Sequence, residues 1–463
     1  MPGVTPLRAA EPLLGGRPGA HAASGPSPFR TTAALMCMLA AFGTAGIGIL
    51  LHGACMPGYE LPGASARMCA SPVANALTGT EFPAGPGRAT GAPAALDPVT
   101  GWFVELGFIL SAGLGAGDMM AFLLVINTIA IAAMALGVAV LMRTLAWLPV
   151  ACISPAIIFS MGQSLDPVGV ACLVWALVLL NPTVAGPQSN LGAGVLFAIA
   201  ALINPLGILA LLTVIVLLWR AGQSSDLLSI GGAALITVGL VLAIDGLIFY
   251  RLSMWWQEPI DRGSLVSLLA YGEGTDPQLL AGVSLAACAI AVIAALAYIT
   301  RRPRPNLYAA LTIVLGLAVV TLPSAPITHA LWLLPFAALA IRRLWVFIAW
   351  ALAEAALVIA VNLSDITALD ASAGLSPAWL LIFTCLRLAA VVAVITAAAL
   401  ELDRSPQPAP ESETTTASGP EAGASGGEVT ASGPETGASG REVTASGPEA
   451  GASAGEAGAN TLE

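Results

Sequence analysis

Lysine is missing from the sequence, and all 17 basic residues are arginine. A phosphate-binding loop of the GxxxxGK[ST] type needs its lysine to contact the terminal phosphates, so the chain has no such loop. This absence disfavours an ATP-driven pump. Charge of either sign is also scarce, because charged residues make up only 10% of the chain, against about a quarter in soluble domains. The composition therefore argues against a soluble globular fold.

Hydrophobic residues make up 57% of the chain, and the mean hydropathy is +0.86. Apolar stretches of spanning length recur between residues 33 and 400, and each such stretch with few charges is typical of a transmembrane helix. We therefore predict an all-α polytopic membrane protein, a bundle of about 10–13 transmembrane helices with the lipid bilayer as its solvent. The membrane domain is expected to cover residues 31–401, after an N-terminal segment, residues 1–30, that we expect to be disordered.

The net charge of -10 comes almost entirely from the C-terminal tail, since residues 401–463 hold 11 acidic residues and two arginines. From Ser418 the tail repeats with a period of 14 residues, as in SGPEAGASGGEVTA followed by SGPETGASGREVTA. These repeats carry almost no bulky apolar side chains, so they cannot offset the conformational entropy lost on folding. We predict that residues 402–463 are disordered, and nothing in the charge pattern indicates a nucleic-acid partner.

The placement of arginine predicts which side of the membrane each segment occupies, because short cytoplasmic loops carry an excess of basic residues. Three arginines place residues 1–30 in the cytoplasm, and the first span, residues 33–52, then delivers the arginine-poor loop 53–101 to the outside. The tail is expected in the cytoplasm. The later arginines that fix the remaining crossings are Arg143, Arg220, Arg301, Arg302, Arg304, Arg342, Arg343 and Arg404.

Two segments must deviate from simple crossings if these arginines are all cytoplasmic. Residues 102–117 are expected to lie along or dip into the outer leaflet, before residues 119–141 cross. Residues 191–219 contain Asn204 and Pro205 near their middle, which predicts two short segments meeting at a break. The alternative is one kinked span that would place the triple-arginine loop outside. The other predicted spans are 146–161, 168–180, 227–250, 279–300, 307–322, 327–341, 344–361 and 377–399.

With this topology most of the unusual polar residues share the outer side, which predicts one outer cavity. The alternative for each residue is simple solvation in a loop. Two adjacent tryptophans and an arginine in the loop 250–269 suit a sugar face and a phosphate, or else an interfacial anchor. The residues of this proposed cavity are Glu60, Asp97, Asp166, Asn204, Trp255, Trp256, Arg262 and His329.

Two pairs of residues leave alternatives open. Cys55 and Cys69 share the first loop, where an oxidising compartment would allow a disulfide, and two free thiols are the alternative. Glu354 and Arg387 lie inside predicted spans, where they either pair structurally or take part in function. We predict no metal site.

Three segments resemble, in order, parts of actinobacterial multi-span glycosyltransferases of the GT-C superfamily, the polyprenol-phosphate-mannose-dependent alpha-mannosyltransferases. They are ISPAIIFSMGQSLDPVGVACLVWALVLL (153–180), RLSMWWQEPIDRGSLVSLL (251–269) and THALWLLPFAALAIRRLWVFIAWALAEAALVIAVNL (328–363). The likeness covers most of residues 33–400 and rests on segment order. It implies a GT-C-like bundle in a bacterial plasma membrane and sugar transfer on the outer face.

The resemblance also implies roles for individual residues. Members usually carry a carboxylate in the first exported loop, which makes Glu60 in Tyr59-Glu60-Leu61-Pro62 the candidate base, with Asp97 as the second candidate. Arg67 or Arg262 would stabilise the phosphate, and His329 would donate to it. The chain departs from the family at Glu60, where Asp is usual, and beside Asn204, where a lysine-containing motif is expected.

The leading hypothesis is therefore an inverting transfer of a sugar, mannose first among candidates, from a polyprenyl-phosphate donor to a cell-envelope glycan acceptor. The donor is a substrate, and no further cofactor is expected. A transporter or lipid flippase is the first alternative, because it also uses broken helices within the membrane. An inactive scaffold of the same fold is the second, since the departures at Glu60 and beside Asn204 are compatible with lost activity.

Overall fold

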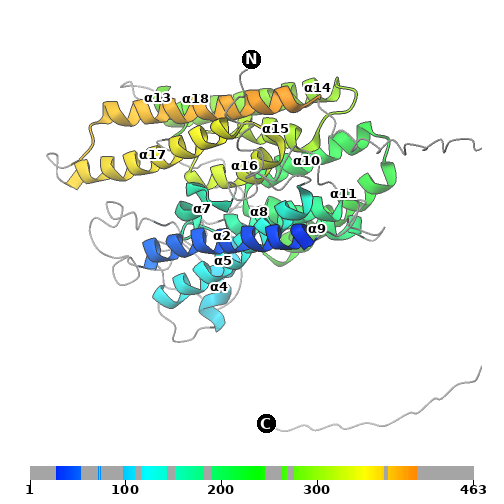
Figure 1. The fold of residues 1–463 in the computed structure, drawn as a ribbon, viewed down its shortest axis with the longest axis horizontal. Helices are drawn as coiled ribbons and strands as arrows, with labels where there is room; N and C mark the ends of the chain where they lie inside the picture. Colours follow the sequence, from blue (N-terminus) through cyan, green and yellow to red (C-terminus); the bar gives the residue numbers. More distant parts are fainter. Residues whose placement is uncertain are drawn as a thin grey trace, which may run out of the picture. The chain divides into compact units, whose positions relative to one another are not determined.

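The computed structural model describes residues 28–53, 71, 73, 97–110, 116–142, 152–181, 189–245, 263–269, 276–369 and 374–403. Helices dominate these residues, and no β-strand occurs among them (Figure 1). Together with the long apolar helices this makes the chain an all-α polytopic membrane protein. The tail, predicted to be disordered, lies outside the described residues.

Six of the described helices are long and apolar enough to cross a bilayer. They are α2 (Pro28–Gly53), α5 (Ala116–Leu141), α11 (Ser224–Ile244), α14 (Pro277–Thr300), α17 (Leu344–Leu369) and α18 (Pro377–Glu401). Five apolar helices are shorter: α8 (Asp166–Leu179), α9 (Ser189–Ile203), α10 (Pro205–Arg220), α15 (Leu307–Thr321) and α16 (Ile327–Ala340). The remaining described helices are α4 (Pro98–Leu110), α7 (Pro155–Ser160) and α13 (Leu265–Leu269).

Helix α16 lies at the centre of the bundle and packs against α5, α7, α8, α15, α17 and α18. All of its residues are buried except Ile327 and Leu339, which are half-buried. The outer helices α11 and α14 are the opposite case, since large apolar side chains such as Leu235 (74% exposed) and Ile290 (68%) point away from the protein. A helix with so much exposed apolar surface is stable only in lipid or against another apolar surface.

Several arginines of the described residues lie where helices end, and we call this region the arginine end; Arg387, inside α18, lies apart from it. Arg220, at the end of α10, donates to the Ile299 carbonyl near the end of α14 (3.5 Å). Arg302 pairs with Asp403 (2.9 Å), just past α18, and Arg342 pairs with Glu401 (3.3 Å). These contacts bring together the ends of α10, α14, α16 and α18 and the start of α15.

The predicted break at Asn204 is confirmed. Helix α9 ends at Ile203, Asn204 has extended backbone (φ -152°, ψ 139°), and α10 begins at Pro205. The two helices pack closely, because a Cβ on Gly207 would lie 2.5 Å from the Ala200 carbonyl carbon and oxygen. Helices α9 and α10 therefore form a hairpin, and α10 ends at the arginine end.

Two other predicted segments need correction. A continuous helix over residues 146–161 is wrong for its described part, because the chain breaks at Ile153 and Ser154 and α7 starts only at Pro155. Ser154 caps α7 by accepting from the Ala156 N–H (3.3 Å), and Pro155 has no N–H with which to continue a preceding helix. The span predicted at 344–361 extends to Leu369. Residues 102–117 were expected not to cross, and their described part up to Leu110 belongs to α4, which has 13 residues and is too short to span.

Candidate functional site

Four hydrogen-bonded side chains lie between α8, α10 and α16 together with His329, and we call these five residues the polar cluster: Ser164, Asp166, Asn204, His329 and Trp332. Asp166 is at its centre and is 5% exposed. Its Oδ1 accepts from Asn204 Nδ2 (3.0 Å) and from Trp332 Nε1 (2.7 Å), and its Oδ2 accepts from Ser164 Oγ (2.6 Å). Three neutral donors therefore stabilise one buried carboxylate.

Local sequence explains how two of these residues come to face each other. Asp166 and Asn204 each precede a proline, and each stands at the first turn of a helix. Asn204 caps α10, since its Oδ1 accepts from the Leu206 N–H (3.0 Å). Its Nδ2 is then left to donate across to Asp166, at the positive end of the α8 dipole.

His329 lies three residues before Trp332 on α16, on the same face of the helix. The ring is 6% exposed and lies within electrostatic reach of Asp166 and Arg387. Its Nδ1 is buried and has no hydrogen-bond partner among the described residues. An unpaired buried nitrogen is costly, which makes this atom the part of the cluster best suited to bind a ligand.

The turn that leads into α8, residues 161–165, is held by polar contacts from other segments. Asn127, in the middle of α5, donates to the carbonyls of Met161 (2.7 Å) and Ser164 (2.9 Å). Ser71 Oγ donates to the Gly162 carbonyl (2.5 Å). Because each contact fixes a backbone atom within a few residues of Asp166, the carboxylate is placed by the fold and not by its own helix alone.

The helices that begin at the polar cluster are short. Helix α8 has 14 residues, α10 has 16 and α16 has 14, or about 21–24 Å each. The neighbouring α17 and α18 have 26 and 25 residues, or about 38 Å. Helix α16 begins beside Arg387, which stands ten residues, or about 15 Å, from the start of α18. The polar cluster is thus recessed from that end of the long helices.

Asp97 lies on the same side of the bundle but outside the polar cluster. Its Oδ1 accepts from the Thr100 N–H (2.8 Å), so it caps α4 ahead of Pro98. Thr100 Oγ1 in turn accepts from the Leu165 N–H (3.4 Å), next to Asp166. The capping role of Asp97 gives a structural reason for this residue, which we had predicted as a catalytic candidate.

The predicted pairing of Glu354 with Arg387 is confirmed. Arg387 Nε donates to Glu354 Oε2 (2.8 Å), and the two side chains are 1% and 2% exposed. Arg387 also donates to backbone carbonyls on either side of the polar cluster. Because a lone charge at this depth is very unfavourable, each member of the pair requires the other.

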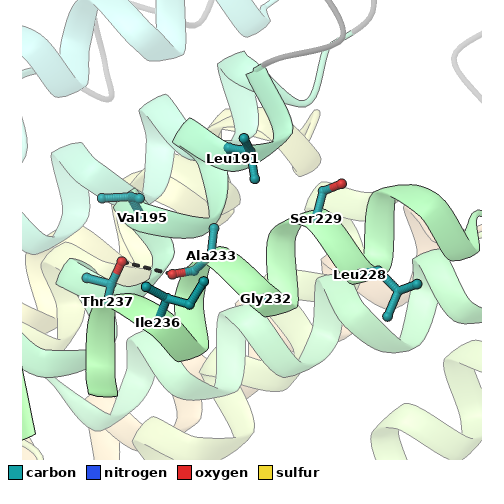
Figure 2. Close-up of a pocket in the computed structure, with 8 residues that line it drawn as sticks. All are labelled: Leu191, Val195, Leu228, Ser229, Gly232, Ala233, Ile236 and Thr237. Atoms are coloured by element: carbon teal, nitrogen blue, oxygen red, sulfur yellow. Dashed lines mark hydrogen bonds between the residues drawn. The ribbon is translucent and has the colours of Figure 1, made fainter. Parts of the chain in front are cut away.

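A groove of about 370 Å³ lies between α9 and α11, well away from the polar cluster (Figure 2). Figure 2 shows Leu191 and Val195 facing residues of α11, among them Thr237, whose hydroxyl donates to the Ala233 carbonyl (2.9 Å). Leu191 is about 20 Å along α9 from Asn204. The groove has no charged residue in its lining and suits an apolar chain.

The structure thus brings together three of the predicted site residues, Asp166, Asn204 and His329. Asp97 lies outside this group and is linked to it through Thr100, which contacts Leu165. Sequence reasoning missed Trp332, Ser164 and Asn127. Asn127 could have been found, because it interrupts an apolar span. The predicted site residues that lie outside the described part are Glu60, Arg67, Trp255, Trp256, Arg262, Cys55 and Cys69.

Comparison with family models, with curated proteins and with solved structures finds no match for this chain. The class that fold and site define is therefore a polytopic membrane protein with a buried polar cluster at the recessed ends of short helices.

Proposed function

We propose that the chain is a membrane glycosyltransferase that transfers a sugar, with mannose the first candidate, from a polyprenyl-phosphate donor to a cell-envelope glycan. The observation that carries the proposal is the polar cluster, with the unpaired Nδ1 of His329 at membrane depth. A lipid-linked phosphate enters from the bilayer, and such a recessed position suits its headgroup. The resemblance of three segments to GT-C enzymes supports the choice of reaction.

In this reaction the acceptor hydroxyl attacks the anomeric carbon of the donor sugar. The bond between that carbon and the phosphate oxygen breaks, and polyprenyl phosphate leaves with the electron pair. The hydroxyl proton passes to a carboxylate, for which Glu60 is the candidate. His329, with a proton on Nδ1, donates to the leaving phosphate, and Arg67 and Arg262 supply positive charge.

The hydrogen bonds of Asp166 favour a positioning role for this residue. Its two oxygens already accept from Ser164, Asn204 and Trp332. In the proposed reaction Asp166 orients Asn204 and Trp332 around the sugar, and its hydrogen bond to Trp332 fixes the face of α16 that also carries His329. The cluster therefore binds substrate mainly through His329 and the indole and amide groups around it.

A second candidate function is favoured by one observation. Asp166 and Asn204 both begin helices after a break in the chain, and they bond directly to each other at 3.0 Å. Facing half-helices of this kind form the substrate sites of many transporters. A transporter or flippase for the same lipid-linked sugar phosphate would use the same residues without forming a glycosidic bond.

The test is transfer from a radiolabelled polyprenyl-phosphate mannose to cell-envelope extract by the purified full chain. Glu60→Gln is expected to abolish the transfer, and His329→Ala to raise the KM for the donor by about tenfold or more, because a phosphate donor is lost. Thr396→Ala, a change on the exposed side of α18, is the control. Activity that survives Glu60→Gln but not Asp97→Asn would move the base to Asp97, since Asn still caps α4.

Two outcomes would contradict the proposal. Labelled substrate that crosses a proteoliposome membrane with no new glycosidic bond would establish the transporter instead. A chain that neither transfers nor transports, yet whose deletion changes the activity of a partner enzyme, would be the inactive scaffold.

A further inference from the structure

Arg387 lies on α18 and is buried, yet it contacts three other segments of the chain. Besides Glu354 on α17, its guanidinium donates to the carbonyls of Ala325 (2.6 Å), Gly263 (3.1 Å) and Pro326 (3.5 Å). Arg387 is ten residues from the start of α18, about 15 Å along the helix. These carbonyls therefore lie at membrane depth, where water is not available to replace an arginine donor.

Glu354 is held in place by a second donor. Its Oε1 accepts from Trp350 Nε1 (3.0 Å), one turn earlier on α17. A buried guanidinium must also satisfy the N–H groups that its ion-pair partner does not reach. In Arg387 these groups donate to backbone carbonyls of two other segments, so the residue ties α18 to both of them.

One of these segments is the turn between α15 and α16. It leads directly into the first turn of α16, where His329 lies. The Pro326 carbonyl accepts both from Arg387 Nη2 and from the His329 N–H (3.0 Å). Arg387 therefore acts on the first turn of α16, from which the imidazole of His329 projects. A displacement of this turn would move His329 relative to Asp166.

The other segment is the stretch from Gly263 into α13. Its Gly263 carbonyl accepts from Arg387 Nη1 (3.1 Å), and Ser264 Oγ accepts from the Ser267 N–H (3.1 Å) in the first turn of the helix. Gly263, Ser264 and Val266 are all buried. Arg387 therefore holds the start of α13 against α18.

The space around Gly263 is filled by the Arg387 side chain. A Cβ at this position would lie 2.8 Å from Arg387 Nη1 and 2.9 Å from Leu357 Cδ2. The contact between the Gly263 carbonyl and Arg387 therefore requires glycine at position 263. A methyl group added there would displace the guanidinium of Arg387.

The structure assigns Arg387 as the positioning residue of the proposed transfer site: its guanidinium fixes the turn that leads to His329 and the start of α13 at Gly263. Glu354 compensates the charge. The inference rests on the proposed function for the nature of the reaction, whereas the restraint on the two segments is independent of it. The experiment therefore measures the restraint and the reaction separately.

The main variant is Arg387→Met combined with Glu354→Gln. Removing both charges avoids an unpaired buried ion, and Gln at position 354 still accepts from Trp350. In a Val266→Cys background, labelling of this buried position in α13 by a soluble maleimide is expected to become several-fold faster, above the native cysteine signal. The kcat for transfer is expected to fall by about 100-fold, because a catalytic group displaced by about 1 Å costs that much.

Two further variants separate positioning from general packing. Arg387→Lys keeps the charge but has a single ammonium, so partial rescue of kcat is expected while labelling stays fast. Gly263→Ala keeps every charge and is expected to give the same two effects, with Gly282→Ala, where a Cβ meets no atom within 4 Å, as its control. Asn362→Ala, which removes a hydrogen bond within α17, is the second control.

Faster labelling and lower kcat in Gly263→Ala and in the double variant, with unchanged controls, would support the inference. Folded variants that label and turn over like the parent chain would overturn it. If the parent has no transferase activity, the labelling alone decides whether Arg387 restrains the segment. If the double variant does not fold, Gly263→Ala carries the test.

Discussion

The hydrogen bonds of Asp166 set the character of the site at the scale of single residues. A carboxylate buried at 5% exposure without a cationic partner is unfavourable unless its oxygens are satisfied. Here the indole of Trp332 supplies the shortest of its nitrogen donors, at 2.7 Å. We had predicted Asp166 as a residue of the outer cavity, and its partners indicate that it holds Ser164, Asn204 and Trp332 in place.

Trp332→Phe tests this role. The variant keeps an aromatic ring beside Gly169 but removes the Nε1 donor, leaving one Asp166 bond unmade. It is expected to lower stability by about 1–2 kcal/mol, seen as a lower unfolding temperature in detergent. Trp345→Phe, at an exposed position (64%) on α17, is the matched control. Equal unfolding temperatures for the two variants would show that the hydrogen bond adds nothing.

The hairpin of α9 and α10 is the element that delivers Asn204 to the polar cluster. A break at an Asn-Pro pair is tolerated at this depth because the freed backbone is satisfied by the Asn204 cap and by the Gly207 N–H to Asn204 carbonyl bond (2.9 Å). Small residues then let the two helices approach closely. The close packing of Gly207 against Ala200 holds α9 and α10 together.

Gly207→Ala is expected to open this hairpin. The added Cβ would lie 2.5 Å from backbone atoms of Ala200, which cannot move away without bending α9. We expect a loss of about 1–3 kcal/mol in stability, measured by unfolding in detergent. Gly231→Ala on α11, where a Cβ meets nothing within 4 Å, serves as the control and should be neutral or slightly stabilising. A neutral Gly207→Ala would contradict the close approach.

For the whole molecule, the arginine end and the polar cluster define opposite sides of the bundle. Helix α10 starts at Asn204, in the polar cluster, and ends at Arg220, and α16 starts beside His329 and ends before Arg342. Because arginine tends to be retained on the cytoplasmic side, we predict that the arginine end is cytoplasmic and that the proposed site faces the outside. The prediction of a shared outer site depends on that orientation.

Cysteine labelling of intact cells tests the orientation. A membrane-impermeant thiol reagent is expected to modify Glu258→Cys, in the loop 250–269 that we predict to be outside, and to leave Ser418→Cys in the tail unmodified until the cells are opened. The background is the parent chain with its seven cysteines. The reverse pattern, with the tail labelled from outside, would place the site in the cytoplasm and exclude transfer to a cell-envelope acceptor.

How much the sequence could predict differs between spans and contacts. Helix α14 was expected at 279–300 and α15 at 307–322, and both lie within two residues of those bounds, because apolar runs end where arginine, proline or asparagine begins. The break in residues 146–161 was missed, since an apolar run conceals a Ser-Pro helix start. Hydrophobicity reports how favourable the transfer of a segment into lipid is, and its value changes little at such a turn.

The sequence by itself determined that the chain is a helical membrane protein, that its arginines gather on one side, and that Asn204 interrupts a pair of short helices. These are properties of local composition. The tertiary structure alone decided which residues meet: the donors of Asp166 come from positions 38 and 166 residues away. Lipid solvates all apolar helix faces alike, so helix pairing is selected by close packing and polar contacts, which no single segment encodes.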